Sequence, residues 1–215
     1  MTRHPIQRTL KRGLDVAVAV TVLLLALPAM ACVAVAIFRR MGQPVLFRQQ
    51  RPGLGERPFL LYKFRTMDDS RGPDGRPLPD AQRLTRLGQF LRRTSLDELP
   101  QLWNVLRGEM SLVGPRPLRC DYLPYFTSHE RLRHSVRPGI TGWAQIHGRN
   151  EASWDQRFAN DVWYVEHWSL WLDGRILWST AWQVFRGRGI VVDAASIMKN
   201  LDDERRSMVI GKTVS

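Results

Sequence analysis

The sequence is poor in cysteine, lysine and recognisable nucleotide- or metal-binding motifs. The two cysteines are Cys32, which lies inside an apolar run, and Cys120. They give no disulfide framework, so we expect a reducing compartment. No P-loop, Rossmann glycine pattern or cysteine–histidine zinc pattern occurs, and the histidines lack the spacing of metal ligands. These absences argue against a disulfide-stapled secreted protein, a P-loop NTPase, a dinucleotide-dependent enzyme and a zinc protein.

Positive charge is abundant by contrast. The chain has 32 lysine and arginine residues against 20 aspartate and glutamate residues, a formal net charge of +12. Almost all of this charge is arginine, because the only lysines are Lys11, Lys63, Lys199 and Lys212. The planar guanidinium group matches phosphate oxygens. The composition predicts a phosphorylated substrate, an anionic membrane surface or nucleic acid as partner, or else a merely solvated basic surface.

One long apolar run lies near the N-terminus. No charged residue occurs from Val16 to Phe38, which is long enough for a straight helix to cross a bilayer. Pro28 lies near its middle, where proline removes a helix hydrogen bond and favours a bend. Both flanks are basic, and positive charge marks the cytoplasmic side of a membrane. We therefore predict a re-entrant helix that is broken at Pro28 and returns to the face from which it entered.

Two alternatives to a re-entrant helix stay open. A signal peptide would explain the basic start, and Ala29-Met30-Ala31 resembles a cleavage site, but the apolar run continues beyond it to Phe38. A plain transmembrane anchor that tolerates a kink at Pro28 also meets the length criterion.

The rest of the chain predicts an α+β fold that is mainly helical. Extended runs at Val45–Gln50 and Pro58–Phe64 flank Gly53-Leu54-Gly55, which is typical of a β-hairpin. Asp68–Gln82 is rich in proline, glycine and aspartate and predicts a mobile loop. We expect helices at Arg83–Arg93 and at Leu102–Leu106, the second ending near Gly108. The stretch Gly114–Pro117 should not be helical.

Tryptophan is concentrated in the C-terminal third. Trp171, Trp178, Trp182 and Phe185 recur at helical spacing and form one stripe. Such a stripe indicates either a buried core face or an interfacial amphipathic helix with tryptophan at headgroup depth. We divide the chain into a membrane segment at residues 1–40, a cytosolic catalytic domain at 41–190 and a C-terminal tail at 191–215.

Two neighbouring acids, Asp97 and Glu98, are the candidate catalytic residues. Ser95 and Glu98 have the spacing of a capping box, which would explain the acids by helix initiation alone. Pro100 argues against a regular helix that starts at Ser95. In the functional interpretation, an ionised carboxylate attacks a phosphate near a helix N-terminus, and the adjacent acids hold Mg²⁺.

An anionic nucleophile needs nearby cations to approach an anionic phosphate. Flanking prolines restrict the backbone of Arg116, which favours either a phosphate clamp or a rigid surface turn. Arg149 follows Gly148 in a glycine-rich stretch that is either a ligand-binding loop or an ordinary loop. The candidate cations are Lys63, Arg65, Arg92, Arg93, Arg116, Arg137 and Arg149.

Several strings together resemble the bacterial sugar transferase family of monotopic phosphoglycosyl transferases, also called undecaprenyl-phosphate sugar phosphotransferases. The resemblance runs from about Lys11 to Gly189. One departure is Leu27, where the best-studied family pattern has serine before the proline that breaks the helix. The matching segments are Lys11–Asp15, Lys63–Met67, Thr94–Val105, Met110–Pro117, Arg137–Gln145, Gly148–Asn150, Asp161–Glu166 and Trp168–Asp173.

The resemblance implies a reaction and a location. Asp97 would attack the β-phosphate of a UDP-sugar and release UMP, and polyprenyl (undecaprenyl) phosphate would then take the sugar phosphate from the aspartate. Glu98 would assist at Mg²⁺ or as a base, and Lys63, Arg92, Arg116 and Arg149 would lie near the phosphates or nucleotide. The implied setting is the cytoplasmic face of the bacterial inner membrane, at the first membrane step of exopolysaccharide or glycoconjugate synthesis.

Two other functions would have different requirements or products. A non-catalytic basic adaptor that binds anionic lipid or nucleic acid would not need Asp97, and an ordinary glycosyltransferase would release UDP. The phosphoglycosyl transferase reading implies no nucleic-acid partner, and it leaves open whether the protein forms a homodimer.

Overall fold

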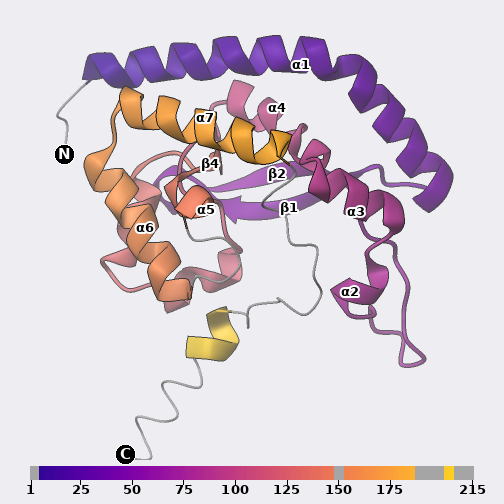
Figure 1. The fold of residues 1–215 in the computed structure, drawn as a ribbon. Helices are drawn as coiled ribbons and strands as arrows, with labels where there is room; N and C mark the ends of the chain where they lie inside the picture. Colours follow the sequence, from indigo (N-terminus) through magenta and orange to yellow (C-terminus); the bar gives the residue numbers. More distant parts are fainter. Residues whose placement is uncertain (1–4, 148–152, 187–200, 206–215) are drawn as a thin grey trace, which may run out of the picture.

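A long N-terminal helix, α1 (Pro5–Met41), lies along one side of the molecule (Figure 1). The computed structural model describes residues 5–147, 153–186 and 201–205. Helix α1 is long and apolar enough to cross a membrane by length and composition, and only 11% of its most apolar window is buried against the rest of the protein. A soluble core helix would be mostly buried, so the apolar surface of α1 is available to another apolar phase.

Pro28 lies inside α1, which is a single continuous helix rather than two helices separated by a gap. Figure 1 shows that α1 changes direction past its middle, so the chain bends without leaving the helical conformation. Leu24, Leu25 and Leu27, which precede Pro28 in the sequence, are exposed. The helix therefore presents apolar side chains to its surroundings just before the proline.

Polar side chains attach the N-terminal half of α1 to the globular part. Lys11 donates to the carbonyl oxygen of Val113 at 3.1 Å and pairs with Asp173 at 2.5 Å. Asp15, which is buried, accepts a hydrogen bond from the backbone N–H of Leu112 at 3.1 Å. These bonds fix the helix to a short buried strand, so α1 is part of the fold.

The C-terminal half of α1 packs through apolar contacts. Ile37 is fully buried in a cluster with Phe64 and Leu91. Both halves of α1 therefore contact the same globular body.

The predicted hairpin is confirmed. β1 (Leu46–Pro52) pairs antiparallel with β2 (Pro58–Phe64), in a register that joins Leu46 to Phe64 and Pro52 to Pro58. The turn contains the short 3-10 helix η1 (Leu54–Glu56), where Gly55 has φ 61°. This left-handed conformation costs glycine little because it has no Cβ.

The other elements follow in short pieces. The predicted loop is largely irregular but ends in a one-turn helix. The predicted helix at Arg83 is wrong by one turn, because Leu84 bridges to Met67 and the Thr85 side chain caps a helix that begins at Arg86. The elements are α2 (Asp80–Arg83), α3 (Arg86–Arg93), η2 (Leu96–Glu98), α4 (Gln101–Leu106), β3 (Ser111–Val113), η3 (Cys120–Tyr125), η4 (Glu130–Ser135), β4 (Gly139–Thr141), α5 (Trp143–His147), α6 (Trp154–His167) and α7 (Leu170–Phe185).

Two buried strands form the centre of the globular part. β3 and β4 pair in parallel, and the main core cluster includes Val105, Leu112 and Tyr164 around them. Gly114 follows β3, and a Cβ there would lie 2.4 Å from the carbonyl oxygen of Arg137. This close approach requires glycine and confirms that the segment after β3 is not helical.

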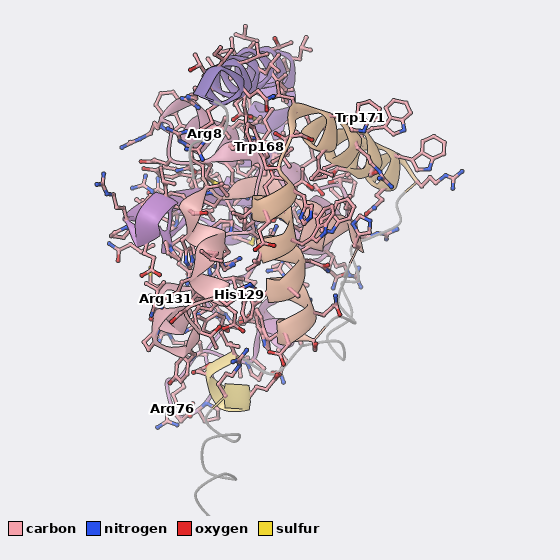
Figure 2. All side chains as sticks on the ribbon, turned by 90° about the vertical axis from the view of Figure 1, so that its left-hand side faces the viewer. Arg8, Arg76, His129, Arg131, Trp168 and Trp171 are labelled. Atoms are coloured by element: carbon pink, nitrogen blue, oxygen red, sulfur yellow. The ribbon has the colours of Figure 1, made fainter. Side chains whose placement is uncertain are left out.

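The tryptophan stripe does not face the core. Trp171 is 81% exposed and Trp178 is 73% exposed on α7, and Figure 2 shows Trp171 projecting outward from the body of the molecule. The core interpretation of the stripe is therefore wrong for these residues. Figure 1 shows α7 beside α1, so the two most exposed apolar surfaces lie on neighbouring helices.

Candidate active site

A large cavity of about 1810 Å³ opens between the hairpin, α3, the η2–α4 segment and α5 to α7. It exceeds the range of about 300–1,000 Å³ that is usual for one small ligand. The structure brings five of the predicted site residues to this cavity: Lys63, Arg92, Asp97, Glu98 and Arg116. The sixth, Arg149, lies outside the described residues.

The remaining predicted cations have different surroundings. Arg93 also lines the cavity. Arg65 lines it too, but its guanidinium group binds nearby parts of the chain: it donates to the carbonyl oxygen of Met67 and pairs with Asp69. Arg137 is not among the lining residues and donates to the carbonyl oxygen of Gly108. Arg65 and Arg137 therefore support the backbone.

The two acids are presented by an unusual backbone. Ser95 has φ 55°, a left-handed conformation that is uncommon for a residue with a Cβ, and its side chain makes no cap hydrogen bond. The capping-box interpretation of Ser95 and Glu98 is therefore wrong. The chain makes one 3-10 turn and then starts α4 at Gln101, after Pro100. The regular helix begins beyond the acids, as Pro100 predicted.

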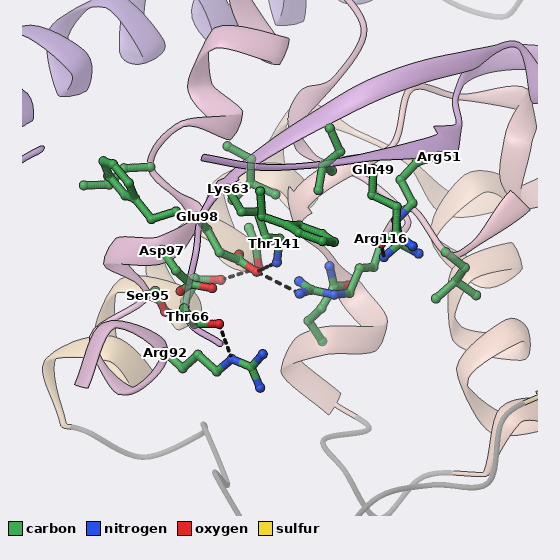
Figure 3. A pocket seen from close by; sticks show the side chains of 18 of the residues that line it. Gln49, Arg51, Lys63, Thr66, Arg92, Ser95, Asp97, Glu98, Arg116 and Thr141 are labelled. Carbon is green, nitrogen blue, oxygen red and sulfur yellow. Dashed lines mark hydrogen bonds and ion pairs between the residues drawn. The ribbon is translucent and has the colours of Figure 1, made fainter. Parts of the chain in front are cut away.

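Glu98 is held by two cations. Its Oε1 atom accepts from Lys63 Nζ at 2.7 Å and from Arg116 Nη2 at 2.7 Å, as Figure 3 shows. Burial disfavours the charged carboxylate, but Arg116 and Lys63 outweigh burial and lower the pKa of Glu98 to about 2. Glu98 is therefore a fixed anion at neutral pH, and such a low pKa makes it a weak base.

Asp97 is in the opposite state. It is 7% exposed and lines the cavity. Burial raises the pKa of its carboxyl group, an effect that Lys63 opposes and Glu98 reinforces. Within the described part of the chain, no hydrogen bond to the Asp97 carboxylate is found, so its oxygens are uncommitted. The two adjacent carboxylates thus differ in hydrogen bonding and in the direction of their pKa shifts, as groups with distinct chemical roles do.

A buried asparagine holds the strand of Lys63 against the helix that follows the acids. Asn104 is fully buried on α4, accepts from the backbone N–H of Tyr62 at 3.2 Å and donates to the carbonyl oxygen of Leu60 at 2.7 Å. These bonds fix β2 opposite η2. Burial lowers the pKa of Lys63, and the ion pair with Glu98 opposes that shift.

Arg92 approaches Asp97 from α3. Its Nε donates to the Thr66 hydroxyl at 3.2 Å. Helix α3 lies very close to this residue, since a Cβ at Gly88 would lie 1.9 Å from the Thr66 carbonyl oxygen. The positive charge of Arg92 is one of the influences that lower the pKa of Asp97. The glycine therefore sets the distance of a cation from the candidate nucleophile.

A buried ion pair positions Arg116. Arg133 Nη2 donates to the Arg116 carbonyl oxygen at 2.7 Å and binds Asp161 at 2.8 Å. The side chains of Arg133 and Asp161 are only 2% and 5% exposed. Sequence reasoning did not assign this pair a role, because the partners are 28 residues apart and no local pattern links them.

Asp97 and Glu98 are adjacent acids that could hold a divalent cation. In the described ranges no group of three or more histidine, cysteine or acidic residues gathers. Magnesium is often bound by one or two carboxylates and completes its shell with substrate phosphates and water. Asp97 and Glu98 fit that pattern.

A model of the bacterial sugar transferase family matches residues 6–187, and the chain belongs to this family. It is 52% identical over 182 residues to the uncharacterized sugar transferase EpsL of Bacillus subtilis, which covers 84% of this chain and 90% of that protein. The family assignment covers α1 as well as the cavity.

Relatives with named reactions are more distant. The UDP-glucose:undecaprenyl-phosphate glucose-1-phosphate transferase of Xanthomonas campestris is 45% identical over 73% of this chain and 35% of its own length. The UDP-N-acetylgalactosamine-undecaprenyl-phosphate N-acetylgalactosaminephosphotransferase of Aeromonas hydrophila is 40% identical over 86% of this chain and 46% of its own length. The chain spans less than half of these two relatives, and their names differ in the sugar.

The Arg133–Asp161 pair gives a prediction. Asp161→Asn leaves a buried guanidinium group without its counter-charge, so we expect a loss of roughly 3–5 kcal/mol in the free energy of unfolding. Denaturant unfolding of the detergent-solubilised protein measures it. Asp155→Asn is the matched control, because Asp155 lies on the same helix and its carboxylate, which pairs with Arg205, is 70% exposed, so that solvent screens the pair and its loss should cost about 1 kcal/mol at most. Equal losses in both variants would contradict the role given to the pair.

Proposed function

We propose that this protein transfers a sugar-1-phosphate from a UDP-sugar to polyprenyl (undecaprenyl) phosphate through a covalent intermediate on Asp97. The observation that carries the proposal is the contrast between the two acids. Glu98 is bound by Lys63 and Arg116, whereas Asp97 faces the same cavity with uncommitted oxygens. The names of several relatives, which combine a UDP-sugar with an undecaprenyl-phosphate acceptor, support the same substrates.

The proposed chemistry has two steps. An Asp97 oxygen attacks the β-phosphorus of the donor, and the bond from that phosphorus to the bridging oxygen breaks, so UMP leaves with the electron pair. An oxygen of the lipid phosphate then attacks the same phosphorus, which regenerates the Asp97 carboxylate and yields a diphosphate-linked lipid sugar. Both steps bring anions together, and Lys63, Arg92 and Arg116 offset that repulsion.

Magnesium is part of the proposal. Asp97 and Glu98 would hold it, and when bound it would supply charge compensation for the diphosphate. Glu98, fixed by two cations, serves to orient those cations and to hold the metal. The low pKa of Glu98 argues against the role of general base.

We further propose that α1 is re-entrant and that the cavity lies on the cytoplasmic face of the bacterial inner membrane. Helix α1 has 37 residues, which is about 55 Å of helix, against an apolar bilayer core of about 30 Å. A spanning helix would carry one end away from the globular body, yet Asp15 and Ile37 both contact it. Exposed tryptophans on α7 suit the headgroup region.

Two other functions give different products. An ordinary glycosyltransferase would release UDP, and a basic adaptor would bind without turnover. The adaptor gains no support from the relatives, several of which are named as transferases.

The covalent step gives the first test of the proposal. Asp97→Asn removes the nucleophile, and we expect UMP release with several UDP-sugars and undecaprenyl phosphate to fall on the order of 10³-fold or more. Labelled sugar phosphate should be trapped on the unaltered protein and absent from the variant. Asp74→Asn, at an exposed loop position, is the control and should keep full activity. Full turnover by Asp97→Asn would end the proposal.

The pH dependence gives a second test. Asp97 must be ionised to attack, so activity should fall as the pH drops through its pKa, which burial has raised. Lys63 lowers that pKa, so Lys63→Met should raise it further and move the acid limb of kcat/KM to higher pH. Arg92→Met should cause a smaller move in the same direction, because its influence on Asp97 is weaker. The pH profile of UMP release measures both. An acid limb that stays in place or moves to lower pH in Lys63→Met would contradict the assignment.

Membrane topology gives a third test. Single cysteines replace Pro5 and Val45 in a protein whose Cys32 and Cys120 have become serine, and a membrane-impermeant thiol reagent is added to intact spheroplasts. Neither position should react from the periplasmic side, whereas both should react in inverted vesicles. Periplasmic labelling at one of the two positions would indicate a helix that crosses the membrane.

A further inference from the structure

A second group of cations lines the cavity on the far side of Arg116. It consists of Arg51 at the end of β1, Arg119 before η3, and Arg157 on α6, with Gln49 beside Arg51. Figure 3 shows Gln49 and Arg51 reaching from the hairpin toward Arg116, while Asp97 and Arg92 lie on the opposite side of Glu98. We call these four residues the distal cluster.

Arg51 is a half-buried member of the distal cluster. Its Nη2 donates to the Gln49 side-chain oxygen at 2.6 Å, whereas its buried Nε has no hydrogen-bond partner. Burial, with Arg116 and Arg119 nearby, lowers the pKa of the Arg51 guanidinium group to about 10. A half-buried cation among like charges is unfavourable unless an anion joins it.

Three of the acids near the distal cluster have their own cation partners. Asp161 binds Arg133 at 2.8 Å and Asp121 binds Arg119 at 2.6 Å, while Glu98 is shared by Lys63 and Arg116. Burial and Arg116 lower the pKa of Arg157, whereas Asp161 opposes that shift, and Asp121 together with Asp202 raises the pKa of Arg119. Because Glu98 is shared by two cations and Arg51 adds a third, positive charge predominates around Arg116 and Arg51.

Apolar side chains also line the cavity. They come from Val18 and Val22 on α1 and from Leu177, Ala181 and Val184 on α7, which contributes the polar Thr180 and Gln183 as well. Both helices carry exposed apolar side chains. A lipid chain is compatible with the apolar residues, and a water-soluble anion with the distal cluster. One cavity thus contains both kinds of lining that the two proposed substrates require.

We propose that Gln49, Arg51, Arg119 and Arg157 bind the phosphate of the nucleoside monophosphate half of the donor, with Arg116 between that phosphate and the one attacked by Asp97. The inference rests on the proposed function. The inference gives the cations of the cavity separate roles. Arg92 and Lys63 act at the transferred phosphate, and the distal cluster holds the leaving group. The phosphate of the lipid acceptor is the other source of an anion with this chemistry.

Arg51→Gln and Arg157→Gln test the assignment. Loss of one charge-assisted phosphate contact should raise the KM for the UDP-sugar and the inhibition constant of UMP by roughly 10- to 100-fold. The KM for undecaprenyl phosphate should stay within about twofold of the unaltered protein, and the melting temperature should not fall. Arg51→Lys, which keeps the charge, should lose less affinity than Arg51→Gln. Arg57→Gln is the matched control, because it removes the same charge from an exposed position of the same hairpin.

Two outcomes would overturn the assignment. A raised KM for undecaprenyl phosphate with an unchanged KM for the donor would give the distal cluster to the lipid phosphate. Unchanged constants for both substrates would show that the cluster binds neither. Equilibrium binding of UMP and of inorganic phosphate, followed by tryptophan fluorescence, separates this inference from the proposed function. If the unaltered protein binds UMP, Arg51→Gln weakens that binding and no turnover is found, the distal cluster stands and the reaction does not.

Discussion

One carboxylate oxygen organises the cavity. Oε1 of Glu98 accepts from both Lys63 and Arg116 at 2.7 Å, and so joins the hairpin to the rigid segment after β3. Because a single carboxylate is shared by two cations, the group formed by Glu98, Lys63 and Arg116 keeps a net positive charge beside Asp97. That excess charge opposes the effect of burial on Asp97 and leaves a field that attracts phosphate. The contrast between the acids follows from this geometry.

Much of the fold is readable from the sequence because it depends on local rules. The hairpin follows from extended runs around Gly53 and Gly55, and the end of the short helix Leu102–Leu106 from Gly108. The start of α3 was misplaced because the Met67–Leu84 bridge, a tertiary contact, competes with helix propensity. The tryptophan stripe could not be assigned, since periodicity gives the same signal for a core face and for an exposed one.

The candidate site was predictable in its members and less so in its arrangement. Asp97, Glu98, Lys63, Arg92 and Arg116 were found from residue chemistry and family resemblance. The left-handed Ser95, the Arg133–Asp161 pair and the distal cluster were not, because each depends on parts of the chain that are remote in sequence. Arg51 lies half-buried and close enough to Arg116 for the two charges to interact, a placement that no local sequence pattern predicts.

The contact between Arg12 and α4 has a mechanical consequence. Arg12 donates to the carbonyl oxygens of Val105 and Leu106 at 2.6 and 3.0 Å, which lie in the last turn of α4, where carbonyl groups lack regular helix partners. The Val105 oxygen also accepts from the backbone N–H of Gly108 at 3.0 Å. Helix α1 therefore adds hydrogen bonds at the end of the helix that follows Asp97 and Glu98. Removing α1 would take away these bonds as well as the proposed membrane contact. In the proposed membrane placement, the depth at which α1 lies in the lipid would fix the height of Asp97 above it.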